Sequence, residues 1–335
     1  MVPEQVRLTD YPAGRPVRDF WARSRDGLRA PEPGDVVVRI DWISVDPGMT
    51  GWITDKRSYM PPVRPGEVMR AFGVGEVIDS RSDRLQVGDW VTGFLGVQTA
   101  GVFKDRMVRR IPTELAPPQL FLSGLGMTGY TAYFGMMDLG CPQAGETVVV
   151  SAASGAVGSM AAQLARDAGA RVIGIAGGEE KCRYLTDQLG LDAAIDYKAG
   201  QVAAQLQTLA PDEVDLYFDN VGGDILDTLL MNMTYQGRIV VCGGISQYAD
   251  WATQKGPANY MQLVTHSLTM RGFTMRDYMH RVPEALDVLI RGWADGRLKC
   301  REHIVEGLDR FPEAFDMLFD GRNHGKLMIR VAHAS

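Results

Sequence analysis

Cysteine is scarce in this chain, and the four cysteines present stand far apart. They are Cys141, Cys182, Cys242 and Cys300, in a chain of 335 residues. No pair has the Cys-x-x-Cys spacing of a redox motif or a zinc ribbon, and nothing resembles the dense framework that stabilises small secreted domains. The five histidines show no ligand spacing either. The sequence therefore predicts reduced thiols and no metal site.

Long hydrophobic runs and an excess of positive charge are also lacking. No apolar stretch approaches the roughly 18 residues of a membrane-spanning helix. The first residues, MVPEQVRLTDYPAGRP, contain no apolar core of a signal peptide. With 41 acidic and 35 basic residues, the net charge of −6 disfavours a nucleic-acid surface. We expect a cytoplasmic protein that binds neither membranes nor nucleic acids.

The most informative stretch is 147–158, with the sequence TVVVSAASGAVG. Its β-branched start predicts a buried strand, small residues follow, and a helix begins near Ala156. Such a strand, turn and helix bind a pyrophosphate, because backbone N–H groups at the helix start face the negative charge. Ala152 stands where the dinucleotide fingerprint has its first glycine, followed by Gly155 and Gly158. The pattern by itself is therefore weak.

The chain on either side of this stretch has two different textures. Residues 1 to about 120 alternate short apolar runs with turn residues and predict an irregular all-β domain. From residue 147, strands and helices alternate, which predicts a parallel, doubly wound sheet with its ligands at the carboxyl ends of the strands. The later predicted strands are 171–176, 194–197, 214–218 and 237–242, with helices near 179–189, 201–209, 281–292 and 311–319. A last strand at 326–331 has no obvious place in this sheet, and we expect it to return to the β domain.

The cofactor preference depends on a missing acid. NAD-binding units place Asp or Glu roughly 20 residues beyond the glycines, on the ribose 2′-hydroxyl. That position falls at 176–178, Ala-Gly-Gly, which admits the 2′-phosphate of NADP. Lys181 and Tyr197 follow at a similar level of the sheet and are candidates to bind that phosphate. The alternative is that Lys181 is only a solvated helix residue.

Besides the strand, turn and helix at 147–158, a series of motifs along nearly the whole chain matches, in the same order, those of a known family. They are Ser44-Val45-Asp46-Pro47, Gly66-Glu67-Val68-Met69-Arg70, Gly129-Tyr130-Thr131-Ala132-Tyr133-Phe134-Gly135, 151–159, Phe218-Asp219-Asn220-Val221-Gly222-Gly223, Cys242-Gly243-Gly244-Ile245-Ser246 and Asn323-His324-Gly325-Lys326. With them the chain resembles the zinc-independent medium-chain dehydrogenase/reductases. Within that family it is similar to the leukotriene B4 12-hydroxydehydrogenase/prostaglandin reductase branch, which includes curcumin-reductase-like and alkenal double-bond reductases.

The resemblance implies an α/β protein with a GroES-like β domain and a doubly wound parallel Rossmann domain. The GroES-like substrate domain would comprise 1–122 and 301–335, and the Rossmann NADP-binding domain 123–300. The resemblance also implies NADPH as cofactor and a homodimer. The reaction it implies is reduction of the C=C bond of α,β-unsaturated aldehydes or ketones, without zinc.

The same resemblance assigns the site residues. The pyrophosphate would lie on Gly155, Ala156, Val157 and Gly158, and the 2′-phosphate on Lys181 and Tyr197. The ribose and nicotinamide would contact Asn220, Cys242, Gly243, Ile245, Ser246, Phe273 and Asn323. Tyr248 matches a tyrosine near the substrate carbonyl, and Tyr59 takes a second such position.

Two departures from the family concern the substrate and the metal. Gly48 and Thr50 stand where the family commonly has a tyrosine and an arginine, which would enlarge or depolarise part of the substrate cleft. Zinc-dependent relatives need a Gly-His-Glu segment, whereas this chain has Gly66-Glu67-Val68. In conjugate reduction without zinc, charge develops on the carbonyl oxygen and needs a donor such as a tyrosine hydroxyl or the cofactor ribose hydroxyl.

Alternatives remain open for individual residues and for the function. Tyr248 and Tyr59 could both be structural aromatics, and Asn323 could cap the turn before Gly325. The alternative enzyme is an NADPH quinone reductase. From another class comes a non-catalytic, crystallin-like protein that binds NADPH and turns nothing over.

Overall fold

The chain folds into two compact units in the computed structural model. The model describes residues 2–12, 14, 18–56, 58–248 and 254–331. The first unit is Met1–Leu122 together with Glu302–Ser335, and the second is Ser123–Arg301. The chain therefore crosses between the units twice. The boundary expected at 300/301 lies one residue before the second crossing.

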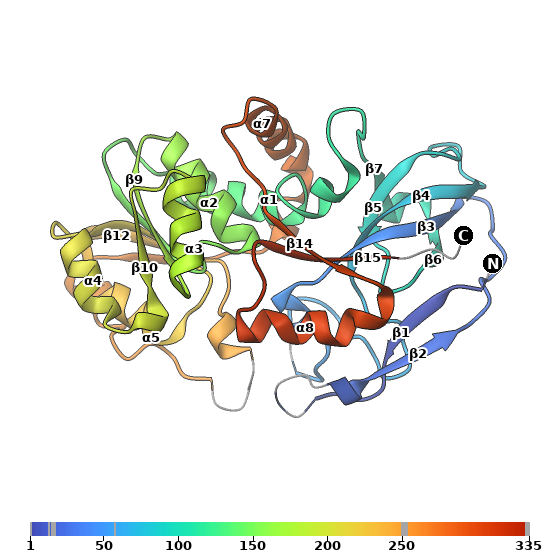
Figure 1. Cartoon of the computed structure of the whole chain (residues 1–335), viewed down its shortest axis with the longest axis horizontal. Helices are drawn as coiled ribbons and strands as arrows, with labels where there is room; N and C mark the ends of the chain where they lie inside the picture. The colour runs from blue at the N-terminus through green and yellow to red at the C-terminus, as the bar shows by residue number, and fades with distance from the viewer. Residues whose placement is uncertain (1, 13, 15–17, 57, 249–253, 332–335) are drawn as a thin grey trace. The chain divides into compact units, whose positions relative to one another are not determined.

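The second unit contains a parallel sheet of six strands, in the order β10-β9-β8-β11-β12-β13 (Figure 1). The strands are β8 (Thr147–Val150), β9 (Arg171–Ala176), β10 (Ala193–Asp196), β11 (Val214–Asp219), β12 (Met233–Val241) and β13 (Thr269–Gly272). The chain winds outward from β8 through β9 to β10 and then returns to start again at β11. This reversal between β8 and β11 is the switch point at which doubly wound folds bind nucleotides. The predicted fold class is confirmed.

Helices connect these strands, and the longer ones, α2, α5 and α7, bury apolar residues. The helical segments are α1 (Met127–Tyr133), α2 (Ala156–Asp167), α3 (Glu179–Arg183), α4 (Val202–Leu209), α5 (Gly223–Leu230), α6 (Gln262–Thr265) and α7 (Val282–Ala294), with π-helical turns η5 (Phe134–Gly140) and η6 (Tyr184–Gln188) and short 3₁₀ turns η7 (Tyr197–Ala199), η8 (Ile245–Gln247), η9 (Met275–Asp277) and η10 (Met279–Arg281). The helix predicted at 179–189 is thus α3 continued by η6. In α2, small residues fill the buried face, which lets the helix lie close to the sheet.

The first unit is built on an antiparallel-rich sheet in the order β14-β15-β3-β4-β5-β7, with β6 paired to β3 and a separate β1-β2 hairpin. The strands are β1 (Glu4–Leu8), β2 (Trp21–Arg25), β3 (Asp35–Ser44), β4 (Phe72–Ser80), β5 (Trp90–Phe94), β6 (Ala100–Lys104), β7 (Val108–Arg110), β14 (Glu302–Glu306) and β15 (Lys326–Arg330), and the helical segments are η1 (Arg18–Phe20), η2 (Pro47–Trp52), η3 (Asp105–Met107), η4 (Pro118–Leu122), η11 (Leu308–Arg310) and α8 (Phe311–Asp320). Figure 1 shows β15 beside β3, to which it pairs antiparallel. The last strand therefore returns to the N-terminal β domain, as expected from the lack of a place for it in the parallel sheet.

One charged residue lies inside the core of the first unit. The Lys326 residue is only 1% exposed. Its ammonium donates to the Asp46 carboxylate and, at 3.4 Å, to the carbonyl oxygen of Val45, while the Ser44 hydroxyl donates to the second carboxylate oxygen. This ion pair ties the start of β15 to the loop that follows β3.

The described residues contain neither a membrane-spanning helix nor a cluster of metal-ligating side chains. None of their helices is both long enough and apolar enough to cross a bilayer. Nor do three or more of their His, Cys, Asp and Glu side chains gather where a metal ion could be held.

Candidate active site

The turn at 151–158 has the geometry of an anion-binding helix start. Gly155 is the N-cap of α2, and no side chain caps the first turn of this helix. The first backbone N–H groups of a helix have no partner within the helix and carry the positive end of its dipole. The N–H groups of Ala156, Val157 and Gly158 therefore lie at the open start of the helix, where a pyrophosphate would meet donors, whereas the N–H of Gly155 donates to the carbonyl oxygen of Ala152 at 2.9 Å.

Gly158 and Ala152 show why small residues are needed in this turn. A β-carbon added to Gly158 would lie 2.4 Å from the carbonyl oxygen of Ala152 and 3.0 Å from the α-carbon of Ala153. Ala152 itself has a positive φ of 47°. A non-glycine residue pays about 1–2 kcal/mol for that left-handed conformation. Ala152 thus adopts the left-handed conformation for which the usual fingerprint has glycine, and this lowers the stability of the fold.

We expect Gly158→Ala to impair both folding and cofactor binding. The new methyl group meets backbone atoms, which cannot rotate away as a side chain can, so the turn or the helix must shift. Overpacking of this kind costs about 1–3 kcal/mol, and NADPH affinity should fall with it. The measurements are urea unfolding and NADPH fluorescence titration. Gly256→Ala is the matched control, since no atom lies within 4 Å of its added β-carbon; equal behaviour of the two variants would contradict the close approach.

The loops after β11, β12 and β13 gather the remaining predicted cofactor residues of the second unit. Asn220 follows β11, and its side-chain amide donates to the carbonyl oxygen of Ser151 at 2.7 Å. Its own carbonyl accepts the N–H of Ile245 at 3.2 Å. The segments from Cys242 to Ser246 and at Phe273 follow the next two strands. All of them lie at the carboxyl edge of the sheet, since the strands are parallel.

Asp219 organises these loops, and sequence reasoning assigned it no role. One oxygen of its fully buried carboxylate accepts hydrogen bonds from the Tyr217 hydroxyl at 2.7 Å, the Ser151 hydroxyl at 3.2 Å, and the N–H groups of Val221 and Gly222, both at 2.9 Å. Its carbonyl oxygen accepts the N–H of the residue after β12. In the sequence, the signal for this structural role is an acid that ends a predicted strand and precedes Asn-x-Gly-Gly.

Cys242 is not a nucleophile in this site. Burial, and secondarily the charge of Asp219, raise the pKa of its thiol to about 12. The thiol therefore stays protonated at neutral pH, and only the thiolate is reactive. Its backbone N–H instead donates to the carbonyl oxygen of Asp219 at 2.8 Å.

Lys181 lies in α3, the helix that follows β9, and Tyr197 directly follows the neighbouring strand β10. The ring of Tyr197 covers Gly177, where an added β-carbon would come within 2.7 Å of the ring. No acid replaces the missing carboxylate here, because Asp196 is used by the backbone: it accepts the N–H groups of Gly178 and Lys198 at 2.8 and 2.9 Å. Those bonds, Gly178 first, lower the pKa of Asp196.

The Tyr248 hydroxyl is folded back over its own loop. It accepts a hydrogen bond from the N–H of Gly244 at 3.1 Å. The hydroxyl oxygen is thereby held at the carboxyl edge of the sheet, close to Gly243. The structure gives this tyrosine a defined position in the loop that follows β12, which is compatible with either role considered for it.

Tyr59 belongs to the first unit and has a bonded hydroxyl. The residue is 58% exposed, but its hydroxyl accepts the indole N–H of Trp52 at 3.1 Å. Burial of this end raises the pKa of Tyr59, against the opposite effect of Trp52. The hydroxyl also lies 3.5 Å from where a β-carbon on Gly48 would be. It therefore occupies part of the space that the missing tyrosine at position 48 would take.

Two other residues of the first unit are turned toward their own backbone. The side-chain amide of Asn323 donates to the carbonyl oxygen of Gly325 at 3.1 Å, which is the turn-capping bond of the alternative explanation. The hydroxyl of Thr50, 3% exposed, donates to the carbonyl oxygen of Pro47 at 2.8 Å. Thr50 thus contributes a buried hydroxyl rather than a polar group on the surface.

Comparisons with known proteins agree with this geometry. Residues 4–111 match the family model described as the N-terminal domain of oxidoreductase, and residues 156–291 match the model described as zinc-binding dehydrogenase. The NADPH-dependent curcumin reductase of Escherichia coli is 37% identical, over 97% of this chain and 96% of its own. The NADP(+)-dependent 2-alkenal reductase of Nicotiana tabacum is also 37% identical, over 98% and 97%.

A solved structure extends the likeness to the fold. The complex of CurA from Vibrio vulnificus with NADPH has a TM-score of 0.94 and 37% identity, over 99% of this chain and 100% of that one. The chain therefore belongs to the zinc-independent medium-chain dehydrogenase/reductases, in the NADP-dependent branch of the curcumin, prostaglandin and 2-alkenal reductases.

Proposed function

We propose that the protein is a cytoplasmic NADPH-dependent reductase of the C=C bond of α,β-unsaturated aldehydes and ketones. The observation that carries the proposal is full-length similarity to relatives named for curcumin and 2-alkenal reduction. The turn at 151–158 and the Lys181–Tyr197 end of the sheet support it, since together they suit a dinucleotide with a 2′-phosphate.

In this proposal NADPH supplies the hydride that the β-carbon of the substrate receives. The chain holds the pyrophosphate with backbone donors of α2 and the 2′-phosphate with Lys181 and Tyr197. Asn220, the loop 242–246, Phe273 and Asn323 line the ribose and nicotinamide. For Asn323 this requires that its amide leave the carbonyl of Gly325 or bond through its remaining atoms.

The negative charge that develops on the carbonyl oxygen needs a neutral donor, and two tyrosines are assigned to it. Tyr248 is held by Gly244 in the nicotinamide loop. Tyr59 is kept protonated by its raised pKa, so it acts as a donor rather than a base. Protonation of the α-carbon is assigned to Tyr248 or to solvent. Because Gly48 has no side chain, nothing from that position covers the Tyr59 hydroxyl.

Oxidation of NADPH in the presence of a substrate panel tests the function. The panel contains short enals, enones of the 1-octen-3-one type, curcumin-like dienones and quinones. We expect turnover of enals and enones. Turnover of quinones alone would identify the quinone reductase, and tight NADPH binding with no turnover of either class would identify the non-catalytic protein.

Replacing the tyrosines separates their roles. We expect Tyr248→Phe to lower kcat by about 10²-fold, the effect of removing one donor to a developing oxyanion. Tyr59→Phe should lower kcat/KM less, because ribose and Tyr248 donors remain. Tyr133→Phe is the control, since that hydroxyl bonds Glu284. Unchanged kcat in Tyr248→Phe would remove this residue from the chemistry and leave it a loop aromatic.

We also propose a homodimer that forms across the edge of the parallel sheet. β13 is the last strand of the sheet, and large apolar side chains are exposed beside it. These are Met231, Tyr235, Tyr260, Met261 and Val264, each at least 50% exposed. Their segments are joined by contacts such as the 2.7 Å bond from the Gln236 N–H to the carbonyl of His266. An unpaired edge next to an apolar surface suits a second copy of the same edge.

A charge in this surface should separate the copies. We expect Val264→Lys to reduce the mass measured by light scattering from two chains to one. The control is Met107→Lys, in the first unit, which replaces an equally exposed side chain. A wild-type protein that is monomeric, or a Val264→Lys variant that keeps the wild-type mass, would contradict this interface.

A further inference from the structure

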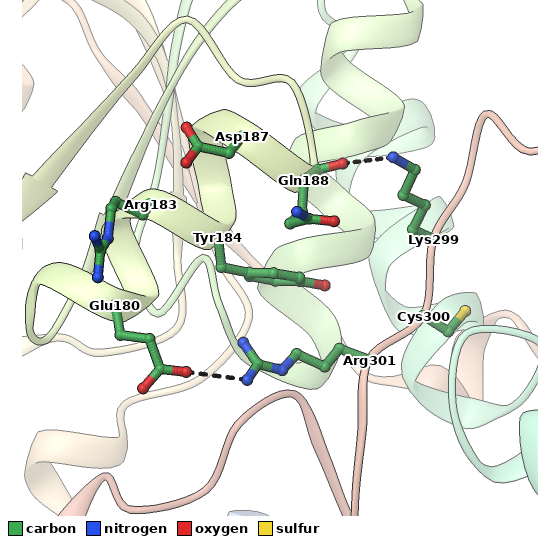
Figure 2. Close-up of a pocket in the computed structure, with 8 residues that line it drawn as sticks. All are labelled: Glu180, Arg183, Tyr184, Asp187, Gln188, Lys299, Cys300 and Arg301. Atoms are coloured by element: carbon green, nitrogen blue, oxygen red, sulfur yellow. Dashed lines mark hydrogen bonds and ion pairs between the residues drawn. The ribbon is translucent and has the colours of Figure 1, made fainter.

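A groove runs between α3 and the segment 299–301 within the second unit (Figure 2). Its volume is about 550 Å³, and it is lined by Glu180, Arg183, Tyr184, Asp187, Gln188, Lys299, Cys300 and Arg301. It adjoins the candidate phosphate site, since Lys181 follows Glu180 in the same helix. The residues of this groove have no role in the function proposed above.

Arg301 lies at the end of the groove nearest Glu180. Its guanidinium stacks over the ring of Tyr184, 5.0 Å from the ring centre, and donates to a carboxylate oxygen of Glu180 at 3.1 Å (Figure 2). Both partners are one helical turn apart on the same face of the helix. The Arg301 side chain is 36% exposed and that of Glu180 64%. The guanidinium is thus oriented by a flat stack and held by one exposed ion pair.

Lys198 follows β10, and its backbone lies close to the start of α3. Its backbone N–H and that of Gly178 donate to one oxygen of Asp196, at 2.9 and 2.8 Å. This clamp fixes the turn after β10 against the turn after β9. Within the described part of the chain, no ion pair engages the exposed Lys198 ammonium. A second cation therefore stands beside the start of α3.

The charges of Lys198, Arg301 and Glu180 all act on the pKa of Lys181. Burial lowers the pKa of Lys181, and the charges of Lys198 and Arg301 lower it further, against the effect of Glu180. The geometry agrees, because the backbone of Lys198 shares an oxygen of Asp196 with Gly178, the residue before α3, and Arg301 pairs with Glu180, the neighbour of Lys181 in that helix. A phosphate bound at Lys181 would be attracted by the charges of Lys198 and Arg301 as well.

We propose that Lys198 and Arg301 are specificity-determining residues for the 2′-phosphate of NADPH, and that Arg301 exchanges Glu180 for that phosphate when the cofactor binds. A guanidinium presents paired N–H donors that match phosphate oxygens. The stack on Tyr184 orients the group in advance, and the open groove leaves room for it to change partners. Glu180 then acts as a competitor that holds Arg301 in the free protein.

Arg301 is also the last residue of the second unit before the chain crosses to Glu302. A contact from this residue to the phosphate therefore fixes the start of the crossing segment. NADH, which has no 2′-phosphate, leaves Arg301 on Glu180. The inference rests on the proposed placement of the phosphate at Lys181, so the test includes that residue.

Calorimetric titration of the whole protein with 2′,5′-ADP and with 5′-AMP, which differ only in the 2′-phosphate, tests the inference without any turnover. The quantity compared is the affinity for 2′,5′-ADP divided by the affinity for 5′-AMP. General damage to the fold should lower both affinities and leave this ratio unchanged. We expect Arg301→Ala and Lys198→Ala each to lower this ratio about tenfold, as the loss of one charge-assisted contact does. Arg183→Ala and Lys299→Ala are matched controls from the same groove, bonded to Glu179 and to the carbonyl of Gln188, and should leave the ratio unchanged.

The variant Glu180→Gln distinguishes the proposed exchange of partners from a purely structural role of Arg301. Removing the competitor should raise the affinity for 2′,5′-ADP severalfold and leave the affinity for 5′-AMP unchanged; an unchanged or lower ratio would overturn the exchange. If Lys181→Ala lowers the ratio while Lys198→Ala and Arg301→Ala do not, the inference is wrong but the site stands. If Lys181→Ala also leaves it unchanged, the phosphate lies elsewhere and both fail.

Discussion

Asp46→Asn is expected to destabilise the protein by about 3–5 kcal/mol, the cost of leaving a buried charge without its partner. Lys326 is 1% exposed, and after the substitution its ammonium would keep only neutral acceptors such as the carbonyl oxygen of Val45. Lys326→Met should cost less, because the Asp46 side chain is 23% exposed and retains the Ser44 hydroxyl. The double variant should recover much of the loss, since an apolar side chain then fills the buried position.

Urea unfolding of the four proteins measures this cycle. Glu306→Gln is the control from the neighbouring strand, because its partner Arg330 is 3.8 Å away and both side chains are at least 60% exposed. Exposed pairs contribute about 0–1 kcal/mol. An Asp46→Asn variant no less stable than Glu306→Gln would show that the buried pair is not a determinant of the fold.

Much of the fold follows from sequence periodicity, and the exceptions have physical causes. The runs that became β8, β9 and β11 are mostly apolar and mostly buried, as is typical of strands covered on both faces. β13 escaped prediction because Thr269–Gly272 is short and polar, as an exposed edge strand tends to be. The strand at 326–331 was placed in the β domain only by elimination. Its antiparallel pairing with β3 depends on contacts nearly 300 residues apart, which no local pattern contains.

The candidate site likewise has features that the sequence predicts and features that it does not. The turn at 151–158 was predictable, because strand, small residues and helix occur in one stretch of sequence. The function of Asp219 was not, since its partner Ser151 follows another strand, 68 residues earlier in the chain, and comes close only through the pairing of β8 with β11. The fingerprint also undervalued Ala152, because a sequence pattern counts glycines, whereas the turn requires a positive φ that alanine adopts here.

Lys181→Ala is expected to weaken NADPH binding by about tenfold to a hundredfold while leaving NADH nearly unchanged. The estimate corresponds to a charge-assisted phosphate contact of about 1.5–3 kcal/mol. Part of that energy is relief of repulsion, because burial and the charges of Lys198 and Arg301 make the ammonium costly in the free protein. A phosphate dianion removes this cost. NADH brings no such charge and gains nothing from the lysine.

The sign of the pH dependence follows from the lowered pKa of Lys181. The lysine must be charged to bind the phosphate, so the preference for NADPH over NADH should decline as the pH rises through that lowered pKa, earlier than for an ordinary lysine. Fluorescence titration with both cofactors, in wild type and Lys181→Ala, measures the preference directly. In Lys181→Ala the alkaline decline should disappear. Equal losses for NADPH and NADH would show instead that the substitution disturbs the fold around Gly177 and Gly178, and the phosphate would have to be sought elsewhere on the carboxyl edge of the sheet.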